Sequence, residues 1–234
     1  MIFVLGGFWL HPLTFVLAGL VILAGTQYEY LIMIRNTGVK PQLVPGMITG
    51  SASYLLATLI AAGILPVKFF LVLIPMMLLI MIVELYRRQE KPFDSLTHTF
   101  FSVLYTGIPL SMFPFAAFSR SGLDSILSHR LEMFSPGIII GFFLLIWAND
   151  TGAYLAGVSF GKHKLFERIS PKKTWEGFFG GVLLVVIVAW LLSSWLGVVG
   201  RTQWIIIALI VSVAGTYGDL IESMLKRSLG VKDS

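Results

Sequence analysis

Residues 174–199 read TWEGFFGGVLLVVIVAWLLSSWLGVV, a run in which Glu176, near its start, is the one charged residue. A helix needs about 20 mostly apolar residues to cross a hydrocarbon core about 30 Å thick. The run is therefore predicted to be a transmembrane helix. A basic segment, 161–173, precedes it, and two acids, Asp219 and Glu222, follow in the next apolar run.

Similar apolar runs recur along the whole chain. We expect membrane spans at about 14–34, 45–64, 68–86, 96–118, 135–160, 174–199 and 203–225. Residues 1–10 are too short to cross untilted and are predicted to form a partial first helix. The predicted fold is an all-α, polytopic integral membrane bundle of about seven full spans. We interpret residues 1–234 as a single transmembrane domain.

The composition supports this fold class. Of the 234 residues, 56% are hydrophobic and 12% charged, and the mean hydropathy is +0.87. The charged share is about half that of an ordinary soluble domain. The chain has no Cys, which excludes disulfides, thiolate metal sites and cysteine nucleophiles.

The basic residues are distributed unequally between the two sides of the predicted bundle. Four of them, Lys68, Arg120, Arg130 and Arg201, fall on one side. The other thirteen fall on the opposite side: Arg35, Lys40, Arg87, Arg88, Lys91, Lys162, Lys164, Arg168, Lys172, Lys173, Lys226, Arg227 and Lys232. By the positive-inside rule the richer side is cytoplasmic. These charges either attract anionic headgroups or substrates, or serve only to orient the protein.

Asp150 lies at an unusual depth for a carboxylate. It precedes the cytoplasmic end of its span by about 10 residues, or about 15 Å of helix. Small residues nearby, among them Gly152 and Gly157, permit close helix packing. Because a charge facing lipid is costly, we expect Asp150 to face the interior, either in a functional site or as a structural hydrogen-bonding group.

The segment before residue 175 has the features of a phosphate site. Lys172 and Lys173 lie at the entrance of a helix, Thr174 is a plausible N-cap, and Glu176 would stand in the first turn. The unpaired N–H groups and positive dipole of a helix N-terminus favour phosphate. The alternative is an ordinary basic loop followed by a capped helix.

Asp219 and Glu222 are three residues apart on one helix face near its cytoplasmic end. Carboxylates and phosphate oxygens suit a hard cation, so Mg²⁺ is the expected metal. The competing interpretation is a structural ion pair of either acid with Lys226. Glu29 and Glu84, also near cytoplasmic ends, are expected to snorkel to the interface.

These segments together resemble the phosphatidate cytidylyltransferases, or CDP-diacylglycerol synthases. The matching motifs cover about residues 145–234, which we take as the catalytic half, and lie at Asn149–Tyr154 (NDTGAY), Ser170–Gly177 (SPKKTWEG), Gly218–Ser223 (GDLIES) and Ser223–Asp233 (SMLKRSLGVKD). The resemblance implies transfer of a cytidylyl group from CTP to phosphatidate, giving CDP-diacylglycerol and pyrophosphate. It also implies a divalent metal, Mg²⁺, joined in some members by a monovalent cation such as K⁺.

The resemblance assigns roles to particular residues. Asp219 is implied as a metal ligand, and Glu222 is a second candidate. We take Asp150, Lys172, Lys173, Glu176 and Asp219 as the candidate catalytic residues. The candidate substrate-binding residues are Ser170, Lys172, Lys173, Thr174, Ser223, Lys226, Arg227, Lys232 and Asp233. Of these, the resemblance implies the six residues Lys172, Lys173, Lys226, Arg227, Lys232 and Asp233. The expected partners are CTP, phosphatidate and membrane lipids, without nucleic acid, and a homodimer is left open.

The chain departs from the family pattern at its end. The family signature continues past Lys232-Asp233 into a glycine-rich turn and an acidic run that supplies a second metal carboxylate. The sequence stops at Ser234, so we expect a partial sequence, truncated also in its first helix, with little or no activity by itself.

Two other functions fit the sequence. A CTP-dependent polyprenol or phytol kinase would transfer the γ-phosphoryl group to a lipid alcohol. An ion-coupled transporter would use the intramembrane acids for ion passage without a nucleotide. If the chain is the cytidylyltransferase, we expect a multi-pass protein of the cell membrane with its active site facing the cytoplasm.

Overall fold

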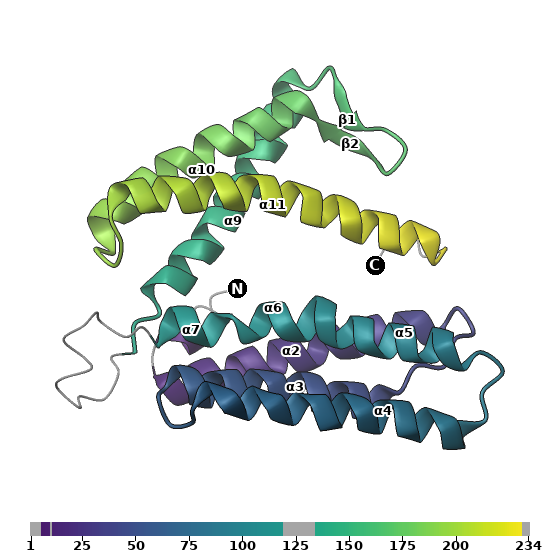
Figure 1. Ribbon diagram of the computed structural model, residues 1–234. Helices are drawn as coiled ribbons and strands as arrows, with labels where there is room; N and C mark the ends of the chain where they lie inside the picture. Colours follow the sequence, from purple (N-terminus) through teal and green to yellow (C-terminus); the bar gives the residue numbers. More distant parts are fainter. Residues whose placement is uncertain (1–5, 10, 119–133, 231–234) are drawn as a thin grey trace. The chain divides into compact units, whose positions relative to one another are not determined.

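The computed structural model describes residues 6–9, 11–118 and 134–230, most of them in helices (Figure 1). Contacts divide the chain into two compact units, Met1–Pro136 (unit 1) and Gly137–Ser234 (unit 2). Unit 2 begins shortly before the catalytic half predicted from about residue 145. The interpretation of the whole chain as a single domain stays a prediction.

The described residues contain seven helical segments that are long and apolar enough to cross a membrane, which confirms the predicted polytopic bundle. Their bounds agree with the expected spans to within a few residues because hydropathy alone marks them. The segments are Pro12–Arg35, Leu43–Ala61, Val67–Arg87, Pro92–Ala117, Gly137–Phe160, Trp175–Trp195 and Arg201–Ser228.

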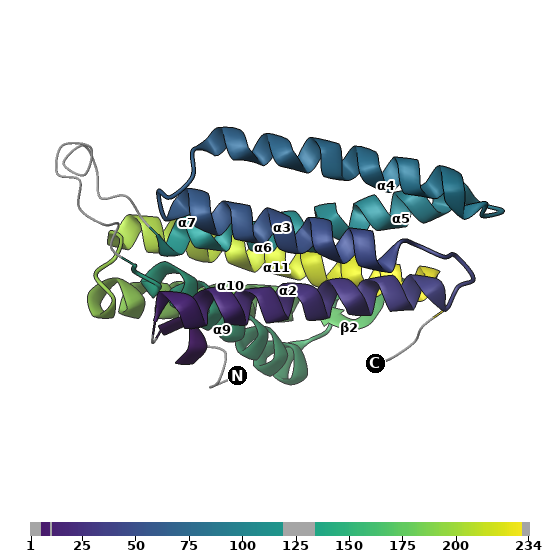
Figure 2. The ribbon, with the colours of Figure 1, turned by 90° about the horizontal axis from the view of Figure 1, so that it is seen from below.

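Unit 1 is built around α3 (Leu43–Ala61), which contacts most of the other helices of this unit. Figure 2 shows α2 (Pro12–Arg35), α3 and α4 (Leu73–Arg87) running lengthwise beside one another. The short 3₁₀ helix η1 (Val67–Val72) leads into α4. The fourth span consists of α5 (Pro92–Ser102), η2 (Val103–Gly107), α6 (Ile108–Ser111) and α7 (Phe113–Ala117).

Prolines interrupt the fourth span. The π-helical turn η2 lies just before Pro109, and α6 and α7 are separated just before Pro114. Proline has no N–H and breaks the hydrogen-bond ladder of the preceding turn. Pro45 causes no such break, because it lies in the first turn of α3, where the N–H has no helical partner.

Buried polar side chains connect the helices of unit 1. The Gln27 Nε2 donates to the Gly46 carbonyl at 2.9 Å and to the Ser102 hydroxyl at 3.1 Å. Glu84 is only 3% exposed, and its Oε2 accepts from Arg87, Gln42 and Ser95. The expectation that Glu84 snorkels is therefore wrong, because donors from three segments hold its carboxylate inside the unit.

Unit 2 consists of α9 (Gly137–Phe160), a hairpin of β1 (Lys164–Phe166) and β2 (Ser170–Thr174), α10 (Trp175–Trp195) and α11 (Arg201–Ser228). Helix α10 packs against both α9 and α11. Side chains from all three helices form the apolar core of unit 2: Leu145, Ala148, Val185, Ala189, Leu192, Trp204, Ala208 and Val211.

Small residues bring α9 and α10 into backbone contact. A Cβ on Gly152 would lie 2.7 Å from the Gly180 carbonyl oxygen and 3.1 Å from the Gly181 Cα. A Cβ on Gly177 would lie 2.8 Å from the Ala153 carbonyl oxygen. Glycine is therefore required where the two helices touch, as the small residues after Asp150 predicted.

The antiparallel hairpin was not predicted from the sequence, which indicated only a basic loop. Its register pairs Lys164 with Thr174 and Phe166 with Ser170. Strands this short carry almost no hydrophobic period, so the pattern of apolar residues does not reveal them. The other secondary-structure elements described in unit 2 are helices, as expected.

We predict that Gly152→Ala destabilises the protein by about 1–3 kcal/mol, because the added methyl group would overpack the contact with α10. The measurement is the thermal unfolding midpoint of the purified protein in detergent. Gly25→Ala is the control, since a Cβ at Gly25 has no heavy atom within 4 Å. An equal midpoint for Gly152→Ala and the wild type would contradict the proposed contact.

Candidate functional site

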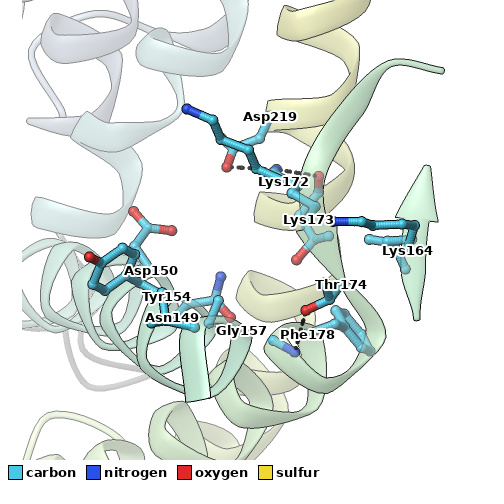
Figure 3. Close-up of a pocket in the computed structure, with 15 residues that line it drawn as sticks. Asn149, Asp150, Tyr154, Gly157, Lys164, Lys172, Lys173, Thr174, Phe178 and Asp219 are labelled. Carbon is cyan, nitrogen blue, oxygen red and sulfur yellow. Dashed lines mark hydrogen bonds and ion pairs between the residues drawn. The ribbon is translucent and has the colours of Figure 1, made fainter. Parts of the chain in front are cut away.

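Unit 2 contains a cavity of about 560 Å³, a volume within the range usual for small-molecule sites. Helix α9, the hairpin, the start of α10 and the C-terminal half of α11 all contribute to its walls. The lining residues are Asn149, Asp150, Ala153, Tyr154, Gly157, Val158, Lys164, Leu165, Lys172, Lys173, Thr174, Gly177, Phe178, Thr216 and Asp219. Figure 3 shows the α9 residues Asp150 and Tyr154 across the opening from the hairpin lysines.

Lys173 and Asp219 form the central ion pair of this cavity. The Lys173 Nζ lies 3.0 Å from the Asp219 Oδ2 and 3.5 Å from the Thr216 carbonyl oxygen (Figure 3). Lys164 and Lys172 also line the cavity, whose other acid is Asp150. Three ammonium groups thus face two carboxylates, which leaves an excess of positive charge suited to an anionic ligand.

Asn149 and Asp150 stand next to each other on α9 but differ in environment. Asn149 is 6% exposed, and its Oδ1 accepts from the Ser212 hydroxyl of α11 at 2.6 Å. Asp150 is exposed and lines the cavity. Asp150 is therefore not the buried structural carboxylate of the alternative interpretation, and its functional role stays a prediction.

Thr174 connects the hairpin directly to α10. Its side chain caps the helix by accepting from the Gly177 N–H at 3.1 Å, which confirms the predicted N-cap (Figure 3). The next residue, Trp175, begins the helix. Lys172 and Lys173 are therefore held at a positive helix N-terminus, where phosphate groups are favoured.

Glu176 does not line the cavity, although the sequence placed it among the catalytic residues. Its carboxylate accepts from the Lys162 N–H at 3.1 Å and from the His163 N–H at 3.2 Å. The His163 Nδ1 lies 2.6 Å from the Glu176 Oε1. Glu176 thus holds the beginning of the hairpin segment against the beginning of α10.

Other predicted site residues lie outside the cavity lining. Ser170 pairs with Phe166 at the start of β2, and Ser223 lies on α11 beyond Asp219. The Glu222 Oε1 lies 2.8 Å from the Lys226 Nζ, so the structure contains the ion pair that competed with metal binding by Glu222.

The C-terminal basic residues differ in what the structure shows of them. Arg227 donates from its Nη1 to the Arg168 carbonyl oxygen at 2.8 Å and so ties α11 to the hairpin turn. Lys232 and Asp233 lie outside the described residues. The substrate-binding roles of Arg227, Lys232 and Asp233 stay predictions.

Several residues that line the cavity were not predicted as site residues from the sequence, among them Asn149, Lys164, Tyr154 and Thr216. For two of them, the helical spacing from a predicted acid could have indicated that they belong to the site. Tyr154 is one helical turn after Asp150, and Thr216 is one turn before Asp219, so each shares a helix face with a predicted acid. Lys164 could not be assigned to the site without knowing that this segment folds into a hairpin.

The oxygen ligands that the cavity offers suit Mg²⁺ in part. Asp150 and Asp219 offer carboxylate oxygens, and Mg²⁺ is usually held by one or two carboxylates together with phosphate oxygens of the substrate. Within residues 6–9, 11–118 and 134–230, no three His, Asp or Glu side chains form a ligand group. The assignment of Mg²⁺ and of Asp219 and Glu222 as its ligands stays a prediction.

The fold and the cavity define a multi-pass membrane protein with a basic, phosphate-compatible site on its last three spans. The chain belongs to the cytidylyltransferase family, whose sequence model matches residues 1–234. The resemblance stated from the motifs is thus confirmed at the level of the family.

Three bacterial proteins illustrate the similarity. A phosphatidate cytidylyltransferase of Staphylococcus epidermidis is 37% identical over 145 residues, covering 58% of this chain and 55% of that protein. One of Haemophilus influenzae is 37% identical over 120 residues, or 47% and 42% of the two chains. One of Staphylococcus aureus is 47% identical over 98 residues, or 41% and 37%. The chain spans about half the length of the curated relatives it matches.

We predict that Glu176→Gln loosens the hairpin, because a neutral amide is a weaker acceptor than a carboxylate for the N–H groups of Lys162 and His163. Hydrogen–deuterium exchange should be several-fold faster at these two amides than in the wild type. Glu167→Gln, an exposed substitution in the same hairpin, is the control. Unchanged exchange in Glu176→Gln would show that Glu176 does not hold this segment.

Proposed function

We propose that this protein transfers the cytidylyl group of CTP to phosphatidate and releases pyrophosphate. The observation that carries the proposal is the convergence of Lys164, Lys172 and Lys173 with Asp150 and Asp219 on one cavity. The curated relatives named phosphatidate cytidylyltransferase support the same reaction.

The proposed reaction is an in-line displacement at phosphorus. A phosphatidate phosphate oxygen attacks the α-phosphorus of CTP, and the bond between that phosphorus and the oxygen bridging to the β-phosphate breaks. Pyrophosphate leaves with the bonding electron pair, and no covalent intermediate on the protein is needed. Lys164, Lys172 and Lys173 would bind and orient the phosphate oxygens and offset their negative charge.

Asp219 and Asp150 would hold Mg²⁺ together with substrate phosphate oxygens. Bound there, Mg²⁺ would supply charge neutralisation for the reacting phosphates and the leaving group. When the nucleotide binds, the Lys173 ammonium group would leave Asp219 and bind a phosphate oxygen instead. A monovalent cation and a homodimer stay predictions of the sequence analysis.

The lining of the cavity suits two substrates of different solubility. Its polar side carries the lysines and acids, and its apolar side includes Tyr154, Val158 and Phe178. Tyr154 is 68% and Val158 70% exposed, so apolar surface continues outward from the cavity along α9. Acyl chains would lie on this apolar side in the cytoplasmic leaflet, while CTP would enter from the cytoplasm.

Product analysis distinguishes the proposed reaction from its rivals. Full-length protein in detergent micelles is given Mg²⁺, phosphatidate and CTP labelled at the α-phosphorus. We expect the label in a CDP-lipid, with pyrophosphate released and transfer dependent on phosphatidate. Lipid phosphate together with CDP would instead indicate a kinase, and ion flux independent of nucleotide would indicate a transporter.

We predict that Asp219→Asn lowers the rate of cytidylyl transfer at least about a hundredfold, because the amide removes the negative charge that would hold the metal. The rate is measured across a Mg²⁺ titration. Asp94→Asn, which changes an acid in the first turn of α5 in unit 1, should leave the rate unchanged. A wild-type rate in correctly folded Asp219→Asn would refute the ligand role.

A further inference from the structure

A second basic cavity lies in unit 1, where the ends of three helices meet. Its volume is about 290 Å³. Arg35 comes from the last turn of α2, Arg87 from the last turn of α4, and Lys40 from the segment just before α3. The remaining lining residues are Pro41, Gln42, Leu43, Val44, Pro45 and Val83.

The charge of this cavity is not balanced within the described part of unit 1. Its lining contains no Asp or Glu. Arg87 pairs at 2.8 Å with the buried Glu84, and it also donates to the Lys40 carbonyl oxygen at 2.9 Å. Among the described residues neither Arg35 nor Lys40 has an ion-pair partner, so two positive charges are left for an anion.

Arg87 is held in a fixed orientation. Its Nη1 lies 2.8 Å from the Glu84 Oε2 and 3.0 Å from the Ser95 hydroxyl, while its Nη2 donates to Lys40. A guanidinium has five N–H donors, so these contacts leave donors for a further acceptor. A preorganised Arg loses less conformational entropy on binding an anion than a mobile side chain does.

The start of α3 borders the same cavity, and of its first three residues Leu43 and Val44 carry free backbone N–H groups while Pro45 carries none. Leu43 is the first helical residue, and the N-cap residue Gln42 makes no side-chain capping bond. The Gln42 side chain turns away to donate to the Ile80 carbonyl and to Glu84. No acid stands in the first turn of α3. The positive end of the helix is therefore available to an anion.

The remaining walls are apolar and lie where the spans leave the hydrocarbon. Arg35 and Arg87 are the last residues of their spans, and Leu43 is the first residue of its own. Val44, which lines the cavity, is 61% exposed, so this wall is open to the surroundings of the protein. A site with cations at the membrane surface and apolar walls toward the lipid suits an amphiphile better than a soluble ion.

We propose that this cavity binds the phosphate headgroup of an anionic phospholipid, with the first methylenes of its chains against Val44 and Val83. The site lies in unit 1 and differs from the cavity of unit 2 in every lining residue. It does not depend on the cytidylyltransferase proposal. The positive-inside rule accounts for the number of basic residues here, but it requires neither their convergence on a cavity nor the uncapped helix.

The test compares lipid binding by two double variants of the full-length protein. Arg35→Gln with Lys40→Gln removes the unpaired charges of the cavity. Arg88→Gln with Lys91→Gln removes the same charge from the adjoining loop, which lines a different cavity that shares only Lys40 with this one. Native mass spectrometry measures the affinity of each for phosphatidylglycerol and for phosphatidylcholine. Lipid bound by unit 2 is common to all variants and cancels in the comparison.

We expect the wild type and the Arg88/Lys91 variant to prefer phosphatidylglycerol, and the Arg35/Lys40 variant to bind it about tenfold more weakly, since charged hydrogen bonds are lost. Equal weakening in both variants would indicate diffuse surface charge and overturn the proposal. Unchanged binding in the Arg35/Lys40 variant would overturn it as well.

A second variant keeps the test decisive if the Arg35/Lys40 variant does not insert. Val83→Phe fills the cavity and keeps every charge, so it should also weaken phosphatidylglycerol binding, and unchanged binding would overturn the proposal.

Inorganic phosphate is added in a separate arm. It should displace the lipid poorly, because the free ion gains nothing from the apolar walls, and displacement at low phosphate concentration would show that a soluble ion is the ligand.

Discussion

The backbone contact between α9 and α10 is the constraint on which unit 2 depends. Glycines at 152, 177 and 181 let the two helices approach until a carbonyl oxygen of one meets the Cα of the other. The contact determines which face of α9 points into the cavity, with Asp150, Ala153 and Gly157 along it. Without this approach the acid of α9 would not face the lysines of the hairpin. The chemistry of the site therefore follows from how closely two spans pack.

The spans and the main elements of the site could be predicted from the sequence because their signals are local. An apolar run of about 20 residues marks a span whatever its neighbours are. The sequence Lys172-Lys173-Thr174 carries both its charge and its N-cap within three residues, and Asp219 stands out as an acid in an apolar helix. The structure places these residues on one cavity.

The features that could not be predicted depend on contacts between distant segments. Glu84 resembles an interfacial acid in the sequence, but Gln42 and Ser95, from elements on either side of α4, help to bury its carboxylate. Glu176 resembles a catalytic acid because it lies beside basic residues, yet it accepts from the backbone of residues 162 and 163. Such partners are set by tertiary packing, which hydropathy and spacing do not encode.

The junction at Thr174 has a consequence for the way the protein can vary. Strand β2 ends at this residue and α10 begins at the next one, with no linker between them. The hairpin therefore continues directly into a membrane span. Inserting or deleting one residue here would turn the lysines by about 100° around the helix axis, as the helical repeat requires. A longer hairpin tip would have to keep the hydrogen bond from Arg227 to the Arg168 carbonyl oxygen, whereas the junction can change only together with the helix that carries it.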